Sequence, residues 1–161
     1  RGNHGSRAMS EPKFDAIDRA ILTFIQNNGR AAYADIGAHA GLSVSAVNER
    51  LKKLQNAGAI RGYGAILEPA AIGLEVLAYV SVLIDWSVHN EAFLEAVMDM
   101  PEVLECHHVT GDWSYLLKIR TRSNDALEDV ISNRIKLLPG VTRSQTVIAL
   151  KSPKESAVLP V

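Results

Sequence analysis

The tripeptide Cys106-His107-His108 combines residue types that bind metals and act as nucleophiles. In a β-strand, alternate side chains point to opposite faces, so Cys106 and His108 would share one face and His107 would point away. The three side chains therefore do not converge on one ion. Because Cys106 is the only cysteine, it forms neither an intrachain disulfide nor a zinc cage of several thiolates. We expect no metal site, no cofactor and no catalytic centre here.

A second group of polar residues has the composition of a DNA-reading surface. Residues 43–57 place the apolar Val44, Val47, Leu51 and Leu54 on one face of a helix, at spacings of 3, 4 and 3. Small residues in a first turn let a helix enter the major groove, where Asn and Arg read base edges and Lys meets phosphates. An ordinary solvated helix face has a similar composition, so this segment alone leaves both interpretations open. The outer face carries Ser45, Ala46, Asn48, Glu49 and Lys52, with Arg50 and Lys53 flanking it.

Two further helices are expected to position this segment. Residues 15–28 begin at a plausible N-cap, Asp15, and repeat apolar residues at helical spacing. Residues 33–40 predict a shorter helix that ends at Gly41. Because only residues 41–43 separate it from the third helix, the pattern indicates a helix-turn-helix. Residues 59–69 alternate in a β-like way and predict the strands of a wing.

The pattern changes after Pro69 to an order of elements that predicts a ferredoxin-like βαββαβ sheet with both helices on one face. Two similar tripeptides, Pro101-Glu102-Val103 and Pro139-Gly140-Val141, lie 38 residues apart, and each would end a helix and begin a strand. The predicted strands are residues 76–84, 102–110, 113–121 and 141–150, with helices before Pro101 and over residues 124–138.

The first predicted strand is apolar on both of its faces, which two helices on one side cannot cover. One side of residues 76–84 carries Leu77, Tyr79 and Leu83, the other carries Val76, Ala78, Val80, Val82 and Ile84, and the helices can cover only one of these two sets. An apolar surface of this size is a liability in a monomer. The sequence therefore predicts a homodimer in which the two sheets pack face to face.

The charge distribution favours two modules. Residues 1–65 hold nine basic and five acidic residues, whereas residues 66–161 hold eight and thirteen, although the whole chain carries a formal net charge of −1. No apolar run reaches the ~18 residues of a membrane-spanning helix, and the single cysteine fits the reducing cytoplasm. The expected divisions are 1–8, an expression-tag remnant; 9–60, a winged helix-turn-helix; 61–74, a linker strand and loop; 75–151, the ferredoxin-like domain; and 152–161, a tail.

Several motifs resemble the transcription regulators of the leucine-responsive regulatory protein and asparagine-synthase activator (Lrp/AsnC) family. They are D-x-x-D-R-x-I-L at 15–22, N-G-R at 28–30, G-L-S-x-S-x-V-x-x-R at 41–50, G-x-I-R-G-Y at 58–63, P-E-V-x-E-C at 101–106, T-G-D at 110–112, Y-L-L-K-I at 115–119 and P-G-V at 139–141. The resemblance covers about Phe14 to Lys151. It implies an α+β protein with an N-terminal winged helix-turn-helix and a ferredoxin-like regulatory domain, forming dimers that often assemble into octamers. The resemblance places Ser43, Ser45, Ala46, Asn48, Glu49 and Arg50 on the recognition helix and Arg61 on the wing.

The same resemblance implies an amino-acid effector bound between regulatory domains, around the turn that joins the second and third strands. Many family members read G-D-Y-D-Y there, whereas this chain reads Gly111-Asp112-Trp113-Ser114-Tyr115. The replacement removes an acidic residue at position 114 that would be a polar partner for a ligand. The corresponding residues are Thr110, Gly111, Asp112, Ser114, Tyr115, Ser144 and Thr146.

Two alternative functions share this layout. Siroheme decarboxylases are enzymes with the same two modules, and a bound tetrapyrrole chromophore would identify one. A DNA-architectural protein would bind the duplex but ignore small molecules, and it would release no heat on titration with amino acids. The sequence has no dedicated catalytic constellation to support the enzyme, and we expect a DNA-binding regulator.

Overall fold

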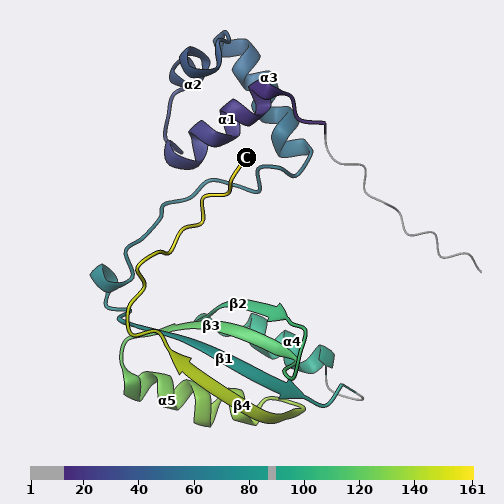
Figure 1. The fold of residues 1–161 in the computed structure, drawn as a ribbon, viewed down its shortest axis with the longest axis vertical. Coiled ribbons are helices and arrows are strands. Elements are labelled where there is room, and N and C mark those ends of the chain that lie inside the picture. Colours follow the sequence, from purple (N-terminus) through teal and green to yellow (C-terminus); the bar gives the residue numbers. More distant parts are fainter. Residues whose placement is uncertain (1–12, 87–89) are drawn as a thin grey trace, which may run out of the picture. The chain divides into compact units, whose positions relative to one another are not determined.

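The computed structural model describes residues 13–86 and 90–161, which form two compact units (Figure 1). The first unit combines the chain up to Ile66 with Ser156–Val161, and the second comprises Leu67–Glu155. The expected tag remnant, residues 1–8, lies outside the described residues, as do residues 9–12 of the predicted first domain. The division assigns the end of the predicted C-terminal tail to the first unit.

Three helices build the first unit: α1 (Ala16–Asn27), α2 (Tyr33–Ala40) and α3 (Val44–Asn56). The predicted N-cap Asp15 is confirmed, since its carboxylate accepts a hydrogen bond from the backbone N–H of Asp18 at 2.8 Å. The carboxylate of Asp18 in turn accepts from the backbone N–H of Asp15, which completes a capping box. The apolar core of the unit consists of Ile21, Ile25, Ile36, Val47, Leu51 and Leu54.

The turn between α2 and α3 is tight because two glycines permit it. Gly41 has a φ of 73°, a left-handed conformation that side chains with a Cβ rarely adopt. Gly37 lies against the backbone of Leu42, whose N–H donates to the Gly37 carbonyl at 2.9 Å. A Cβ on Gly37 would lie well inside van der Waals contact with the carbonyl oxygen of Leu42. This close approach sets the angle at which α3 leaves α2.

The expected wing does not form within this chain. Residues 59–68 have no regular secondary structure, and a short 3₁₀ turn follows at Ala70–Ile72. The residue types do alternate, but a strand also requires a partner for its backbone groups, and no strand pairs with this segment among the described residues of the unit. Ile66, an apolar residue of this segment, is 87% exposed.

The second unit confirms the predicted βαββαβ order. It contains β1 (Val76–Ile84), α4 (Asn90–Met98), β2 (Val103–His108), β3 (Tyr115–Thr121), α5 (Asn124–Asn133) and β4 (Val141–Ile148). The strands form one antiparallel sheet in the order β2-β3-β1-β4 (Figure 1). The second helix is shorter than predicted, because a 3₁₀ turn at Ile135–Leu137 replaces its last residues.

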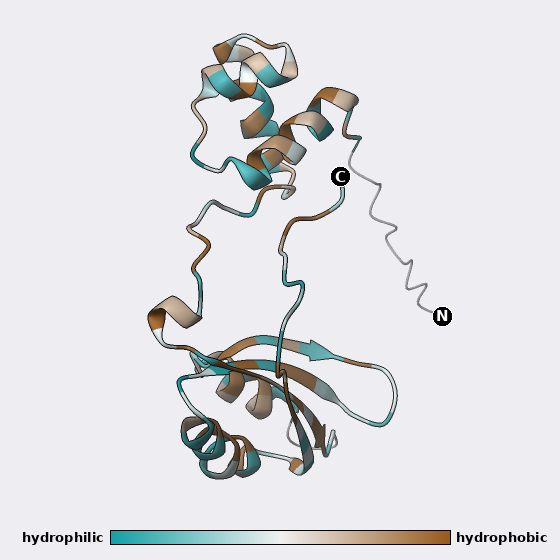
Figure 2. Ribbon diagram, turned by 60° about the vertical axis from the view of Figure 1, so that its left-hand side comes forward, coloured by the Kyte–Doolittle hydropathy of each residue, from teal (hydrophilic) through white to brown (hydrophobic). Residues whose placement is uncertain are grey.

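The two faces of β1 differ as the sequence predicts. Ala78, Val80, Val82 and Ile84 are buried in one core with residues of α4 and α5, such as Phe93 and Leu127. Tyr79 and Leu83, on the opposite face, are only partly buried, although Leu77 is buried. Hydrophobic residues lie along the strands (Figure 2). One face of the sheet thus has no helix over it in the described chain.

Candidate nucleic-acid interface and effector site

Helix α3 is divided into an inner and an outer face. Val47, Leu51 and Leu54 are buried against the other helices, whereas Ser45, Glu49 and Lys52 are exposed. The N-terminus is capped by Ser43, whose hydroxyl accepts from the backbone N–H of Ala46 at 3.2 Å. Ala46 and Asn48 are partly buried. The prediction was wrong for Val44, which lies in the first turn of the helix, is 53% exposed and does not belong to the core of the unit.

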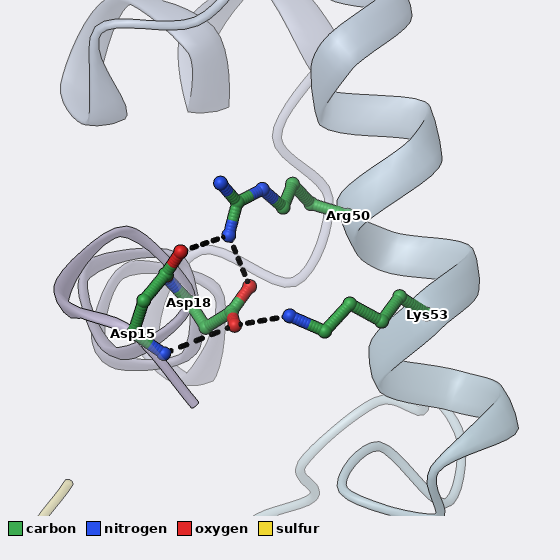
Figure 3. Close-up of polar contacts among 4 residues, drawn as sticks. All are labelled: Asp15, Asp18, Arg50 and Lys53. Carbon is green, nitrogen blue, oxygen red and sulfur yellow. Dashed lines mark hydrogen bonds and ion pairs between the residues drawn. The ribbon is translucent and has the colours of Figure 1, made fainter. Parts of the chain in front are cut away.

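Arg50 and Lys53, predicted as flanking DNA contacts, bind carboxylates of α1 (Figure 3). The Nη1 atom of Arg50 lies 2.5 Å from Asp15 Oδ2 and 3.1 Å from Asp18 Oδ1. The Nζ atom of Lys53 lies 2.7 Å from Asp18 Oδ2. Asp18 is 0% exposed. We call these four residues the α1–α3 ion cluster, and it binds α3 to α1.

The cations hold both carboxyl groups of the cluster in their charged form. The hydrogen bond from Arg50 is the main reason that the pKa of Asp15 is lowered to about 2. Burial alone would raise the pKa of Asp18. The hydrogen bonds from Lys53 and Arg50, together with the backbone N–H of Asp15, outweigh burial and bring the pKa of Asp18 below its usual value. The same contacts raise the pKa of the Arg50 guanidinium.

Arg61, the predicted wing contact, is exposed on the segment that follows α3. It lines a groove of about 550 Å³ together with apolar residues of α1 and the last three residues of the chain. The Gln26 side chain holds that end of the chain, donating to the Leu159 carbonyl at 3.0 Å and accepting from the Leu159 N–H at 2.7 Å. The sequence analysis missed this contact, because no local pattern links residues so far apart.

The predicted effector residues are divided between an exposed turn and a buried framework. Thr110, Gly111 and Asp112 are exposed at the β2–β3 turn, where Gly111 has a φ of 97°. Ser114 is buried, and its hydroxyl accepts from the Ile84 N–H at 3.1 Å. Thr110, Gly111 and Asp112 are therefore open to a ligand from solvent, whereas Ser114 is not.

The other three predicted effector residues lie within the sheet. Tyr115 is buried and donates its phenolic hydrogen to Asn90 Oδ1 at 2.7 Å. Ser144 and Thr146 are partly buried and pair with Val82 and Val80 of β1, so they share the helix-covered face. The expectation that Ser144 and Thr146 lie on one face is confirmed, and that face is the one that α4 and α5 cover.

Two contacts beside the turn were not predicted. The Arg143 guanidinium lies over the Trp113 ring, 5.4 Å from its centroid. Trp86 packs on His108 and Tyr115, with centroid distances of 4.8 and 5.7 Å. The aromatic residues were visible in the sequence, but these contacts depend on strand register. Here His108 belongs to an aromatic cluster.

Cys106 is partly buried, and burial raises the pKa of its thiol. A thiol of this kind is a poor nucleophile because little of it is ionised. Among residues 13–86 and 90–161, no cluster of His, Cys, Asp and Glu could hold a metal ion. A search of the same residues for a helix long and apolar enough to span a membrane found none.

Comparisons with known proteins match both units. The AsnC-type helix-turn-helix domain model matches residues 14–55, and the Lrp/AsnC ligand binding domain model matches residues 77–159. The chain belongs to the Lrp/AsnC family. The HTH-type transcriptional regulator FL11 of Pyrococcus horikoshii is 34% identical over 147 residues, which cover 91% of this chain and 96% of that protein.

Two solved structures of regulators have the same fold. The transcriptional regulator NMB0573 of Neisseria meningitidis, in complex with L-methionine, has a TM-score of 0.88 and 32% identity, covering 92% of this chain and 97% of its own. The feast or famine regulatory protein of Mycobacterium tuberculosis, also complexed with L-methionine, has a TM-score of 0.83 and 32% identity, covering 90% and 97%.

The family assignment separates a DNA-binding regulator from the enzyme considered above. The chain is an Lrp/AsnC-type transcriptional regulator that binds DNA through its helix-turn-helix. Its relatives are regulators and not enzymes, so the comparisons give no support to a siroheme decarboxylase.

Proposed function

We propose that the protein reads DNA with the outer face of α3 lying in the major groove. The observation that carries this proposal is the division of α3 into a buried apolar face and an exposed polar face that is capped at its start. Asn48 and Glu49 can bond to base edges, and Lys52 can meet a phosphate. Ser43, Ser45 and Ala46 allow the close approach, and Arg61 would contact the backbone nearby. Arg50 and Lys53 would act from the edge of this face, where α1 holds them.

We further propose that an amino acid modulates DNA binding from the β2–β3 turn. Two similar regulators are complexed with L-methionine. In this chain the exposed Asp112 carboxylate would accept the ligand ammonium, and Thr110 and the Gly111 backbone would offer hydrogen bonds. Arg143, held over Trp113, would supply a cation for the ligand carboxylate. Ser114, Tyr115, Ser144 and Thr146 would shape the turn and its floor.

The uncovered face of the sheet supports a homodimer. Tyr79, Leu83 and Leu116 lie on this face and are only partly buried in the protomer. A second copy packed sheet to sheet would remove them from water. Assembly of such dimers into octamers or other rings would place the effector turn between neighbouring regulatory domains, where a ligand could favour one packing over another.

Isothermal titration against each of the twenty amino acids tests the effector proposal. We expect saturable heat with at least one amino acid. Asp112→Asn and Arg143→Gln should each weaken this binding about tenfold or more, because each leaves one ligand charge unpaired. Asp125→Asn, an exposed carboxylate at the start of α5, is the matched control and should leave it unchanged.

Absence of heat with every amino acid would favour an effector-independent DNA-architectural protein.

Sedimentation velocity tests the assembly, with a dimer or larger species expected. Tyr79→Arg should shift that species towards the monomer, because it would bury a further cation in the interface, on the face that already carries Lys118 and Arg120. A wild-type protein that sediments as a monomer would contradict the proposed dimer.

A further inference from the structure

We propose that Asp18 is a positioning residue for DNA recognition. It holds Arg50 and Lys53 so that the outer face of α3 keeps one orientation relative to α1. This inference rests on DNA binding through the helix-turn-helix, and it assigns to α1 a role in specificity without any contact with DNA. It also gives Arg50 and Lys53 a role different from the direct DNA contact that their position suggests.

The bonds of the α1–α3 ion cluster use both oxygens of Asp18. Oδ1 accepts from Arg50, and Oδ2 accepts from Lys53 and from the backbone N–H of Asp15 (Figure 3). Arg50 also bridges to Asp15 Oδ2. The carboxylate is therefore fixed to its own helix by the capping box before it binds α3. Such an acceptor does not move with α3, so it can define where that helix lies.

The two attachment points on α3 constrain the rotation of the helix as well as its distance. Residues 50 and 53 are three apart, so they lie one above the other along one side of α3. That side flanks the apolar stripe of Val47, Leu51 and Leu54. Apolar contacts are non-directional and tolerate small rotations. Charge-assisted hydrogen bonds to a fixed carboxylate are directional and tolerate them less.

Burial makes this arrangement costly to rearrange. Asp18 is 0% exposed, so an Asp18 carboxylate without its cations would be a buried, unpaired charge. The side chains of Arg50 and Lys53 are 27% and 48% exposed, so they span from the buried carboxylate to the surface beside the DNA-reading face. Rotation of α3 would therefore break bonds that water cannot easily replace.

The charges of the cluster distinguish positioning from direct phosphate binding. Two carboxylates and two cations cancel, so the cluster as a whole offers little attraction to phosphates. Lys52, which is exposed and does not belong to the cluster, is the contrasting cation on the same helix. Loss of a phosphate-binding cation lowers the dependence of log affinity on log salt concentration by about one unit, whereas loss of a positioning group does not.

The test is fluorescence anisotropy with two duplexes at several salt concentrations. One duplex is selected by the wild-type protein from a random library, and the other has unrelated sequence. For Asp18→Asn we expect the affinity for the selected duplex to fall about tenfold, which is the size of one lost base contact. The affinity for the unrelated duplex should stay equal or rise, because the substitution removes a negative charge. The salt dependence should not fall, because no phosphate-binding cation is lost.

Matched variants separate the explanations. Asp35→Asn removes an exposed carboxylate from α2 and should preserve the preference for the selected duplex. Lys52→Gln should lower the salt dependence for both duplexes. If Asp18→Asn does not fold, Lys53→Gln is measured instead, and Lys53→Arg should restore the preference because it can still reach Asp18.

The proposal is overturned if Asp18→Asn, or Lys53→Gln in its place, keeps the wild-type preference. It is also overturned if both duplexes lose affinity equally, as they would from a smaller folded fraction alone. A wild-type protein that selects no duplex would contradict DNA recognition itself, and this inference with it.

Discussion

The two units are stabilised in different ways. In the described residues, the regulatory unit has thirteen buried apolar residues in one core, whereas the DNA-binding unit has six and adds a buried carboxylate between two helices. A small unit buries a smaller fraction of its surface and gains less from it. The difference teaches that the orientation of α3 depends on a few directional bonds, while the sheet depends on packing spread over many side chains.

Phe93→Ala should give the largest loss of stability. Phe93 is fully buried between α4 and the sheet and stacks on Tyr115 at a centroid distance of 5.1 Å. The cavity should lower the free energy of unfolding of the regulatory unit by about 3–5 kcal/mol. Both tryptophans lie in this unit, so their fluorescence during urea denaturation measures it. A loss below about 1 kcal/mol would mean that this core is less tightly packed than described.

Gly37→Ala should give the next largest effect and act on the other unit. The added Cβ would press on the Leu42 carbonyl, so the turn before α3 must open. We expect a loss of about 1–3 kcal/mol, as for other overpacked sites, together with weaker DNA binding. Amide hydrogen exchange in α2 and α3 measures the change. Gly29→Ala, which meets only an ordinary van der Waals contact, is the control.

Acid should loosen the DNA-binding unit through its ion cluster. The folded-state pKa values of Asp15 and Asp18 are below their ordinary values, so the cluster stabilises the fold fully above about pH 4. That stabilisation is lost as the pH falls from about 4 towards 2. The NMR signals of α1 and α3 recorded over this range measure the loss. Asp18→Asn should show a smaller change, and an equal change would contradict this origin.

Two serine caps, one on a helix of each unit, allow the smallest of the predicted stability losses to be compared between the units. The Ser43 hydroxyl caps α3 by accepting a hydrogen bond from a backbone N–H at 3.2 Å, and the Ser123 hydroxyl caps α5 in the same way at 3.1 Å. Replacing either by Ala should cost about 1 kcal/mol in its own unit. Only Ser43→Ala should weaken DNA binding, as measured by anisotropy. Equal effects of both on DNA affinity would contradict the assignment of recognition to α3.

The sequence predicts those features that depend on local periodicity. The spacing of Val47, Leu51 and Leu54 locates the inner face of α3, and the alternation in residues 76–84 locates the two faces of β1. The inward direction of Arg50 was not predictable from the helix alone, because it depends on a carboxylate 32 positions earlier. The prediction of a wing was wrong for a related reason, since β-like alternation in one segment does not supply a partner strand.

The candidate effector site shows the same limit. The Gly111-Asp112 turn is readable from its residue types, whereas burial of Ser114 and Tyr115 depends on Ile84 and Asn90 from other elements. Arg143 was missed because its place over Trp113 follows from the pairing of β4 with β1.

The most direct measurement is the affinity of the double variant Asn48→Ala/Glu49→Ala for duplexes of selected and unrelated sequence. The account predicts that the variant folds normally and binds the unrelated duplex at least as well as the wild type. Its preference for the selected duplex should fall about tenfold or more, since base contacts are lost and phosphate contacts remain. Glu128→Ala on α5 is the control. An unchanged preference in the double variant would show that another surface reads the DNA.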